Sequence, residues 1–287
     1  MSRRTYLHWG LVLALAAAAS PAPSAPSAPA FQPTRFAVTV QGSGPDVILI
    51  PGLASGRGIW KGTVAALPDH RFHLVQVAGF AGAPAAGNGK GPVAAPVADE
   101  IARYVAATGL RRPAIVGHSM GGSIAMMVAA RHPGAAGRVM VVDMLPSPAR
   151  PFGVAPAVSR PIARLVGREW QGADRVRRDM QGLVGRFGSA DWLESRSDSG
   201  VVGRSLEELL STDLTPELPR IAAPLTVVYA CPRTLAFTCS GIGRTFSKAY
   251  ARRPGTRLVR VDGSGHSIML DQPGKFQAAL KAFLAGG

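Results

Sequence analysis

The feature that most constrains this fold is a serine set between glycines at the end of an apolar run. Residues 114–122 read Ala-Ile-Val-Gly-His-Ser-Met-Gly-Gly, and a helical pattern follows at 123–131. In so tight a turn from strand to helix, the serine must adopt a strained backbone conformation, and side chains beside it would block the turn. We therefore expect glycine at 117 and 121 for steric reasons. The Ser119 hydroxyl would then be aimed at a helix N-terminus, where backbone N–H groups stabilise negative charge.

Buried strands alternate with helices along most of the remaining chain. Runs of β-branched residues predict strands, and apolar residues at helical spacing predict helices. The expected strands are 35–40, 46–50, 72–77, 114–116, 138–142, 225–229 and 257–261, and the expected helices are 97–108, 123–131 and 273–284. The glycine-containing residues 41–45 predict a hairpin-type turn. The alternation as a whole predicts an α/β fold with a mostly parallel sheet that helices cover on both faces.

The N-terminal residues 1–30 do not follow this alternation. They contain Arg3 and Arg4, an apolar stretch at 7–19 and a run rich in proline, alanine and serine. This order is typical of a secretory signal peptide with a linker, and the apolar stretch is short for a membrane-spanning helix. We therefore expect an exported protein, periplasmic or secreted, whose folded domain comprises residues 31–287.

A second interruption lies inside the expected domain, at about residues 146–223. This segment is polar, rich in arginine and without a buried strand. It predicts a helical insertion that caps one edge of the sheet.

The chain has two cysteines, Cys231 and Cys239. In the oxidising compartment that export implies, we expect them to form a disulfide, and the alternative is two unpaired small hydrophobic residues. A structural zinc site would need a second pair of ligands, which this spacing does not supply. We expect no metal ion and no organic cofactor.

The formal net charge of +15 raises the question of a polyanionic partner. Of the 32 basic residues, five are lysine and 27 are arginine, and they are scattered along the chain instead of forming one block. We interpret this as a general arginine bias and expect no nucleic-acid binding. The phosphate-loop motif G-x-x-x-x-G-K-S/T is absent from the sequence. Weak association with an anionic membrane surface stays open as an alternative, and the sequence does not predict the oligomeric state.

Three short motifs each follow one of the expected strands. They are Pro51-Gly52-Leu53, Gly117-His118-Ser119-Met120-Gly121-Gly122 and Gly263-Ser264-Gly265-His266. With this order and spacing, nearly all of the chain after residue 30 resembles the α/β-hydrolase superfamily, including its esterases and lipases. The resemblance implies the α/β-hydrolase fold, a nucleophilic Ser119, and an oxyanion hole formed by the backbone N–H groups of Leu53 and Met120.

A serine hydroxyl needs a base that accepts its proton, and the chain offers six histidines. His8 lies in the predicted signal peptide, and His118 lies inside the serine motif. His70 and His73 lie around the entry to a strand, and His132 lies at a helix end. At its helix end, His132 is expected to cap backbone carbonyls. His266 follows the last strand and reaches the same sheet edge as Ser119, so we expect it to be the base.

The acid partner departs from the family pattern. Most members carry Asp or Glu just after the strand that corresponds to 225–229, but this chain has neither residue from 218 to 261. Part of the superfamily carries its acid after the preceding strand, where Asp143 stands here. Its carboxylate would accept the Nδ1–H of His266 and hold the correct tautomer. We expect Asp143 to complete the triad, and Asp262 or a Ser-His dyad are the alternatives.

The resemblance thus implies an exported serine hydrolase that cleaves a carboxylic ester through an acyl-enzyme intermediate. The substrate would be a small-molecule or lipid ester. One alternative is a non-hydrolytic enzyme of the same fold, such as a perhydrolase, lyase or acyltransferase. Another is a catalytically silent binding protein in the periplasm, which the missing usual acid would allow.

Overall fold

The computed structural model describes residues 31–150, 196–232 and 238–286. The compact unit that we describe begins at Phe31. The predicted signal peptide and linker, residues 1–30, lie outside the described residues. So does the larger part of the predicted insertion, residues 151–195.

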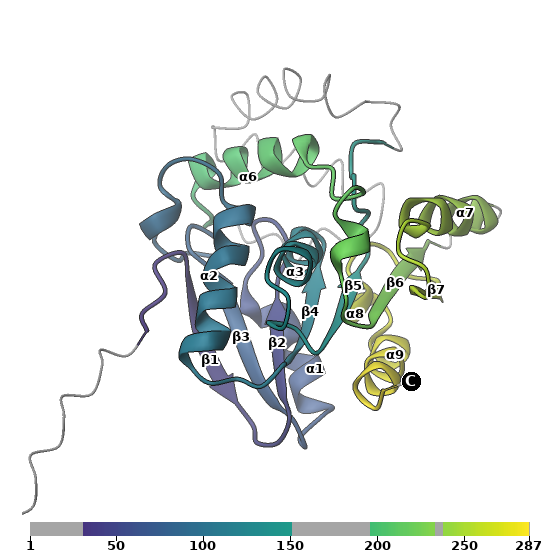
Figure 1. The fold of residues 1–287 in the computed structure, drawn as a ribbon, viewed down its shortest axis with the longest axis horizontal. Helices are drawn as coiled ribbons and strands as arrows, with labels where there is room; N and C mark the ends of the chain where they lie inside the picture. The colour runs from purple at the N-terminus through teal and green to yellow at the C-terminus, as the bar shows by residue number, and fades with distance from the viewer. Residues whose placement is uncertain (1–30, 151–195, 233–237, 287) are drawn as a thin grey trace, which may run out of the picture. The chain divides into compact units, whose positions relative to one another are not determined.

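A seven-stranded sheet forms the centre of this unit, in the order β1-β3-β2-β4-β5-β6-β7 (Figure 1). Its neighbouring strands are parallel except β1 and β3, which pair antiparallel at one edge. The strands are β1 (Phe36–Gln41), β2 (Asp46–Ile50), β3 (Arg71–Val77), β4 (Ala114–His118), β5 (Arg138–Val142), β6 (Leu225–Cys231) and β7 (Arg257–Asp262). The α/β fold and the mostly parallel sheet that the sequence predicts are confirmed.

The predicted hairpin turn at 41–45 is wrong as a pairing of two strands. β1 and β2 do not pair with each other, because β3 lies between them and pairs with both. The turn glycines serve a different purpose. A Cβ atom at Gly42 or Gly44 would collide with the carbonyl oxygen of His70 or Asp69, respectively. The turn needs glycine because it passes close to the backbone that leads into β3.

Helices cover both faces of the sheet (Figure 1). α2 and α3 lie side by side over one face, and α1 and α9 pack together on the other. The described helices are α1 (Lys61–Ala65), α2 (Ala94–Ala107), α3 (Met120–Arg131), α6 (Ser199–Ser211), α7 (Cys239–Tyr250), α8 (Ile268–Asp271) and α9 (Pro273–Leu284), with the short 3₁₀ turns η1 (Arg57–Trp60), η2 (Ala86–Asn88) and η4 (Leu218–Arg220).

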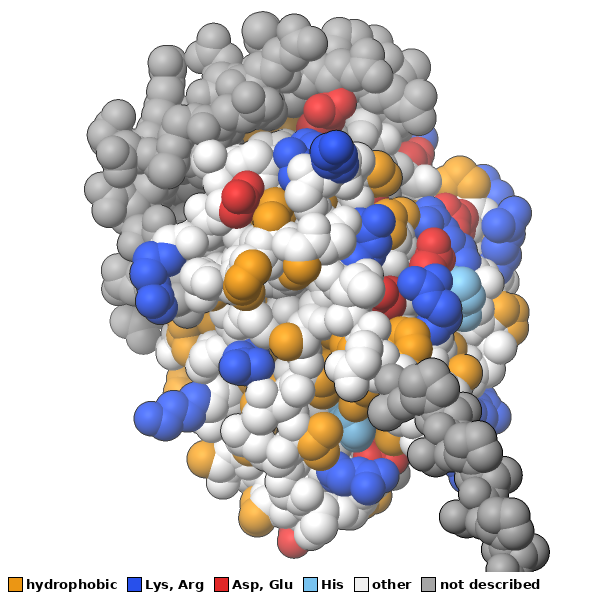
Figure 2. Space-filling view, turned by 90° about the vertical axis from the view of Figure 1, so that its left-hand side faces the viewer, with side chains coloured by type: hydrophobic (Ala, Val, Ile, Leu, Met, Phe, Trp, Pro, Cys, Tyr) orange, Lys and Arg blue, Asp and Glu red, His pale blue; other side chains and the backbone are white. Residues whose placement is uncertain are grey.

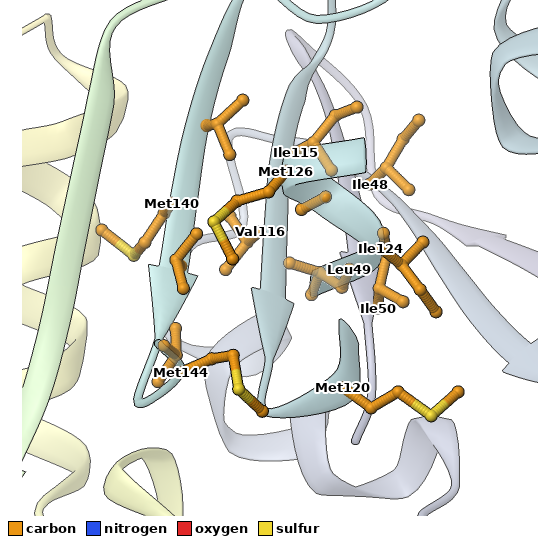
Figure 3. Packing of buried hydrophobic residues seen from close by; sticks show 14 of the residues in the cluster. Ile48, Leu49, Ile50, Ile115, Val116, Met120, Ile124, Met126, Met140 and Met144 are labelled. Carbon is orange, nitrogen blue, oxygen red and sulfur yellow. The ribbon is translucent and has the colours of Figure 1, made fainter. Parts of the chain in front are cut away.

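The hydrophobic core lies on both sides of the central strands (Figure 3). Ile48, Leu49 and Ile50 of β2, Val116 of β4 and Met140 of β5 are fully buried. Because successive residues point to opposite faces, a strand covered on both faces has a nearly continuous run of apolar residues. This explains the continuous apolar runs in the sequence, and it leaves the carboxyl ends of the strands as the place where polar side chains gather.

Charged side chains are spread over the surface that Figure 2 shows. Lys and Arg side chains lie there singly or in small groups, and several of them lie beside Asp or Glu side chains. In the part of the chain that the structure describes, no helix is both long enough and apolar enough to cross a bilayer.

The described end of the predicted insertion lies against the carboxyl edge of the sheet. The hydroxyl of Ser197 donates to the carbonyl of Ala54, which follows β2, at 3.3 Å. The backbone N–H of Asp198 donates to the carbonyl of Gly79, which follows β3, at 2.7 Å. α6 therefore begins directly over the loops that border the expected site.

α6 also supplies the N-terminal cap of α2. The Glu208 carboxylate accepts hydrogen bonds from the backbone N–H groups of Val93, Ala94 and Ala95, at 2.6, 2.7 and 2.8 Å. Val93 is the N-cap residue of α2 and makes no side-chain cap of its own. A helix whose first N–H groups lack an internal acceptor gains both hydrogen bonds and a favourable charge from such a carboxylate.

We expect Glu208→Ala to lower the free energy of unfolding by about 2–4 kcal/mol, because three helix N–H groups lose a charged acceptor. The measurement is urea unfolding followed by circular dichroism. Glu208→Gln keeps an acceptor oxygen without the charge, so its loss should be intermediate. Equal unfolding midpoints for wild type and Glu208→Ala would contradict the role of this cap.

Candidate active site

Ser119 lies on the sharp turn between β4 and α3. Its φ of 53° and ψ of −124° lie outside the helical and strand regions. A residue with a side chain keeps such a conformation only where its surroundings enforce it. Here the Ser119 N–H donates to the carbonyl of Val142 at 2.9 Å, and the Ser119 carbonyl accepts from the N–H of Gly122 at 2.7 Å. The strained backbone that the sequence predicts is present and is anchored to the end of β5.

The glycines around this turn leave no space for a side chain. A Cβ atom at Gly117 would overlap the carbonyl oxygen of Gly121, and one at Gly121 would overlap the carbonyl oxygen of Ile50. Larger residues would therefore push α3 away from β4 and β2. The predicted steric requirement is confirmed at both positions.

The loop after β2 passes beside the Ser119 turn. A Cβ atom at Gly52 would come within 3.1 Å of both the Nδ1 atom of His118 and the Cβ atom of Ser119. Leu53, the next residue, is buried. Met120 is the first residue of α3, where the backbone N–H groups precede the internal hydrogen bonds of the helix. The fold thus brings the loop of Leu53 and the start of α3 together at Ser119.

His266 and Asp143 meet at the carboxyl edge of the sheet. His266 lies in the loop after β7, and Asp143 directly follows β5. The Nδ1 atom of His266 and the Oδ2 atom of Asp143 are 2.7 Å apart. Because an ionised carboxylate can only accept, Nδ1 carries the proton in this bond, and Nε2 is the ring nitrogen able to accept one.

Asp143 is held from several sides. It has a φ of 51°, in the left-handed region that Asp tolerates better than most residues. Its N–H donates to the carbonyl of Val228 at 2.8 Å, and its Oδ1 atom accepts from the N–H of Ala230 at 2.9 Å. Both carboxylate oxygens are therefore engaged, one by the backbone of β6 and the other by His266.

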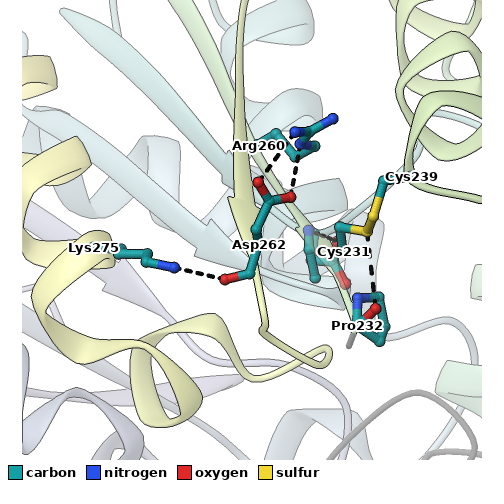
Figure 4. The surroundings of a disulfide bond; sticks show 8 residues. Cys231, Pro232, Cys239, Arg260, Asp262 and Lys275 are labelled. Carbon is teal, nitrogen blue, oxygen red and sulfur yellow. Dashed lines mark hydrogen bonds and ion pairs between the residues drawn. A yellow bond between two sulfur atoms is a disulfide. The ribbon is translucent and has the colours of Figure 1, made fainter. Parts of the chain in front are cut away.

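Asp262, the other carboxylate considered from the sequence, has a different partner (Figure 4). It forms an ion pair with Arg260, with 2.7 Å between Nε and Oδ1, and its side chain is 56% exposed. The Asp143 side chain is 15% exposed and faces His266. Asp262 thus lies on the solvent side of the edge strand β7, where it balances the charge of a neighbouring arginine.

A disulfide joins Cys231, the last residue of β6, to Cys239, the first residue of α7 (Figure 4), with 5.6 Å between the Cα atoms. Residues 233–237 between them lie outside the described residues. The Cys231 carbonyl accepts from the N–H of Gly263 at 2.8 Å, so the disulfide lies next to the loop that carries His266. Asp262 lies within 4.8 Å of both sulfurs. Disulfide sulfurs are not thiolate ligands, so we do not assign this group as a metal site.

His118 is packed against His266. The ring centroids are 4.7 Å apart, and the Nε2 atom of His118 lies 3.0 Å from the His266 carbonyl, to which it can only donate. Burial, and next the neighbouring His266, hold the pKa of His118 well below its usual value, although the hydrogen bond opposes this. The ring is therefore neutral and places no positive charge beside the expected base. No sequence pattern predicts this contact, because it involves a backbone atom 148 residues away.

Of the remaining described histidines, His73 and His132 have polar partners, whereas the buried Nδ1 atom of His70 has no hydrogen-bond partner within the described residues. His73 lies between Asp46 and Tyr104, at 2.9 and 2.7 Å. The prediction that His132 caps backbone carbonyls is wrong: its Nε2 atom lies 2.8 Å from a carboxylate oxygen of Asp99. Asp99 belongs to α2, which lies beside α3. The packing of these two helices therefore brings a carboxylate to His132, and a carboxylate is a stronger acceptor than the backbone carbonyls at the end of α3.

Comparisons with known proteins agree with this architecture. The sequence model of the alpha/beta hydrolase family matches residues 47–280. A curated relative, the pimeloyl-(acyl-carrier protein) methyl ester esterase of Aeromonas hydrophila, is 26% identical over 261 residues, which cover 85% of this chain and 96% of the relative. Among solved structures, a hydrolase from Pseudomonas aeruginosa has a TM-score of 0.68 at 18% identity, covering 87% of this chain and 94% of that chain. A thermophilic esterase from Thermogutta terrifontis has a TM-score of 0.63 at 21% identity, covering 88% and 93%.

Each comparison supports a different statement. The solved structures are less than 25% identical to this chain, so they show a shared fold. The relative that is named as an esterase supports ester hydrolysis in general.

Proposed function

The chain belongs to the alpha/beta hydrolase family, and from this we propose that it is an exported serine hydrolase that cleaves carboxylic esters with Ser119, His266 and Asp143. The observation that carries the proposal is the 2.7 Å hydrogen bond between His266 Nδ1 and Asp143 Oδ2. It keeps the imidazole in the tautomer whose Nε2 atom can take the proton of a serine hydroxyl.

In the proposed reaction, the Ser119 oxygen attacks the ester carbonyl carbon while its proton passes to Nε2 of His266. The tetrahedral intermediate then collapses, and the alcohol leaves with that proton while the acyl group stays on Ser119. Water next attacks the acyl-enzyme and gives a proton to His266. The carboxylic acid is released as this proton returns to Ser119. Asp143 stabilises the imidazolium that forms in both halves of the cycle.

Leu53 and Met120 are the residues that we propose for the oxyanion hole. Their support is positional: the Gly52 backbone lies against Ser119, and Met120 begins α3. Two N–H groups at this place would bind the negative oxygen of the tetrahedral intermediate. Loss of one such donor typically raises the barrier by about 2.7–4 kcal/mol.

The unusual place of the acid has a structural explanation. In most family members the acid follows the strand that corresponds to β6. In this chain Asp143 follows β5, and its carboxylate reaches the end of β6, where the N–H of Ala230 holds it at 2.9 Å. The side chain thus extends toward the usual location of the acid, which supports a triad over a Ser-His dyad.

Substrate class and location are part of the same proposal. The substrate that we propose is a small-molecule or lipid ester, which the relative named as an esterase supports. The predicted signal peptide supports action outside the cytoplasm. The Aeromonas relative is named for a methyl ester on an acyl-carrier protein. Cell fractionation tests export. Salt-dependent sedimentation with anionic vesicles tests the weak surface association that the charge allows.

The proposal is tested with purified protein that starts at Phe31, a series of p-nitrophenyl esters of rising acyl length, and a fluorophosphonate probe for activated serines. We expect turnover of several esters with an optimum in acyl length, and probe labelling at Ser119. Labelling without ester turnover, but with acyl transfer to peroxide or alcohol, would favour a non-hydrolytic enzyme. Neither labelling nor turnover would favour a binding protein.

A further inference from the structure

Tyr250, the last residue of α7, donates a buried hydrogen bond next to Asp143. Its side chain is 2% exposed. Its hydroxyl donates to the carbonyl of Met144 at 2.7 Å and lies 3.6 Å from the sulfur of Met126. Met144 directly follows Asp143 in the chain, whereas Tyr250 is 106 residues away from Met144. The hydroxyl therefore connects α7 to the turn that presents the proposed acid.

The conformation of that turn depends on contacts on both sides of Asp143. Its φ of 51° is strained for a residue other than glycine, so the surroundings must maintain it. On the N-terminal side, the Asp143 N–H bonds to Val228 of β6. On the C-terminal side, the Met144 carbonyl bonds to Tyr250. Without the hydroxyl, a buried carbonyl would lose this donor, and the backbone after Asp143 could rotate to find another.

α7 is joined by two contacts to β6, the strand whose backbone also binds Asp143. Its first residue forms the disulfide with Cys231 at the end of β6. In its middle, the ring of Phe246 stacks on the ring of Tyr229 of β6, with centroids 4.6 Å apart and planes at 18°. The Tyr250 hydroxyl and the Ala230 N–H therefore approach the Asp143 turn from two elements that are joined to each other.

The Tyr250 phenol stays protonated at neutral pH. Burial, and secondly the charge of Asp143, raise its pKa well above the usual value. The hydroxyl thus remains a donor in the pH range in which a histidine base works.

We propose that Tyr250 is a positioning residue for Asp143: by holding the Met144 carbonyl, its hydroxyl keeps the Asp143 carboxylate aimed at His266. This inference rests on the proposed role of Asp143 as the acid. The competing explanation is that the hydrogen bond stabilises the fold and has no effect on the orientation of the carboxylate.

Tyr250→Phe removes the hydroxyl and keeps the ring. Tyr229→Phe is the matched control, because within the described residues the Tyr229 hydroxyl makes no hydrogen bond, while its ring packs in the same α7–β6 interface. We expect Tyr250→Phe to lower kcat by about 3- to 10-fold with little change in KM, the effect of one hydrogen bond on the barrier. Tyr229→Phe should stay within about twofold of wild type, since no hydrogen bond is lost.

The pH profile separates positioning from a purely structural role. A carboxylate that faces His266 less well stabilises the imidazolium less, so the ring is protonated only at lower pH. The acidic limb of the kcat/KM profile should therefore move to lower pH in Tyr250→Phe and not in Tyr229→Phe. When combined with Asp143→Asn, Tyr250→Phe should cause almost no further loss, because it acts through Asp143.

The inference is overturned if Tyr250→Phe lowers only the melting temperature, with the kinetics and pH profile of Tyr229→Phe, or if its loss is equally large in the Asp143→Asn background. Failure of the proposed function has a different signature, namely a wild type without turnover and without labelling at Ser119. In that case, the downfield proton NMR signal of His266 Nδ1–H gives the test. It should broaden or shift in Tyr250→Phe alone, and an unchanged signal would refute the positioning role.

Discussion

Ser119→Ala is expected to lower kcat/KM for ester hydrolysis by about 10⁴- to 10⁶-fold, because no other group can form the acyl-enzyme at this turn. The fold should survive, since the turn is held by backbone contacts. These include the hydrogen bond from the Ser119 N–H to Val142 and the close approach of Gly117 to Gly121. Initial rates on the best p-nitrophenyl ester, with circular dichroism of the same sample, measure both effects.

Ser123→Ala provides the control for this experiment. Ser123 lies one turn further along α3, is 1% exposed, and its hydroxyl has no hydrogen-bond partner within the described residues. Its loss should leave the rate within about twofold, because no interaction disappears. Wild-type activity in Ser119→Ala would exclude the covalent mechanism. Equal losses in both variants would show that the effect comes from repacking of α3.

Asp143→Asn is expected to lower kcat by about 10³- to 10⁴-fold, the second largest effect. Asn also tolerates the left-handed conformation, and its amide oxygen can still accept from the Ala230 N–H. The NH₂ group then faces Nδ1 of His266, where the carboxylate oxygen stood at 2.7 Å. A donor at this place favours the tautomer with the proton on Nε2, so the ring loses its ability to accept the proton of Ser119.

Asp262→Asn distinguishes the alternatives for the acid. Asp262 is an exposed partner of Arg260, and exposed ion pairs contribute about 1 kcal/mol or less. We therefore expect activity close to that of wild type. A large loss in Asp262→Asn with activity retained in Asp143→Asn would reverse the assignment. Near-normal activity in both variants would favour a Ser-His dyad.

The site could be predicted from the sequence where its chemistry depends on local backbone geometry. Around Ser119, the strand, the turn and the helix are contiguous, so the glycines at 117 and 121 already reveal the tight turn. The sequence also predicts His266 as the base, because its loop follows a strand of the same parallel sheet. Asp143 is harder to predict, because its carboxylate lies at the end of a strand that begins 82 residues later.

The sequence by itself determined the alternation of strands and helices, the buried central strands and the strained serine. These features can be predicted from the sequence, because hydrophobic periodicity and steric exclusion act over a few neighbouring residues. Only the tertiary structure decided that β3 lies between β1 and β2, that Glu208 caps α2, and that Tyr250 holds the turn after Asp143. Each of these depends on contacts between segments far apart in the chain: two strand pairings for β3, three hydrogen bonds for Glu208 and one for Tyr250. Such contacts leave no pattern in the sequence around either partner, because they arise when the packed core brings the two segments together.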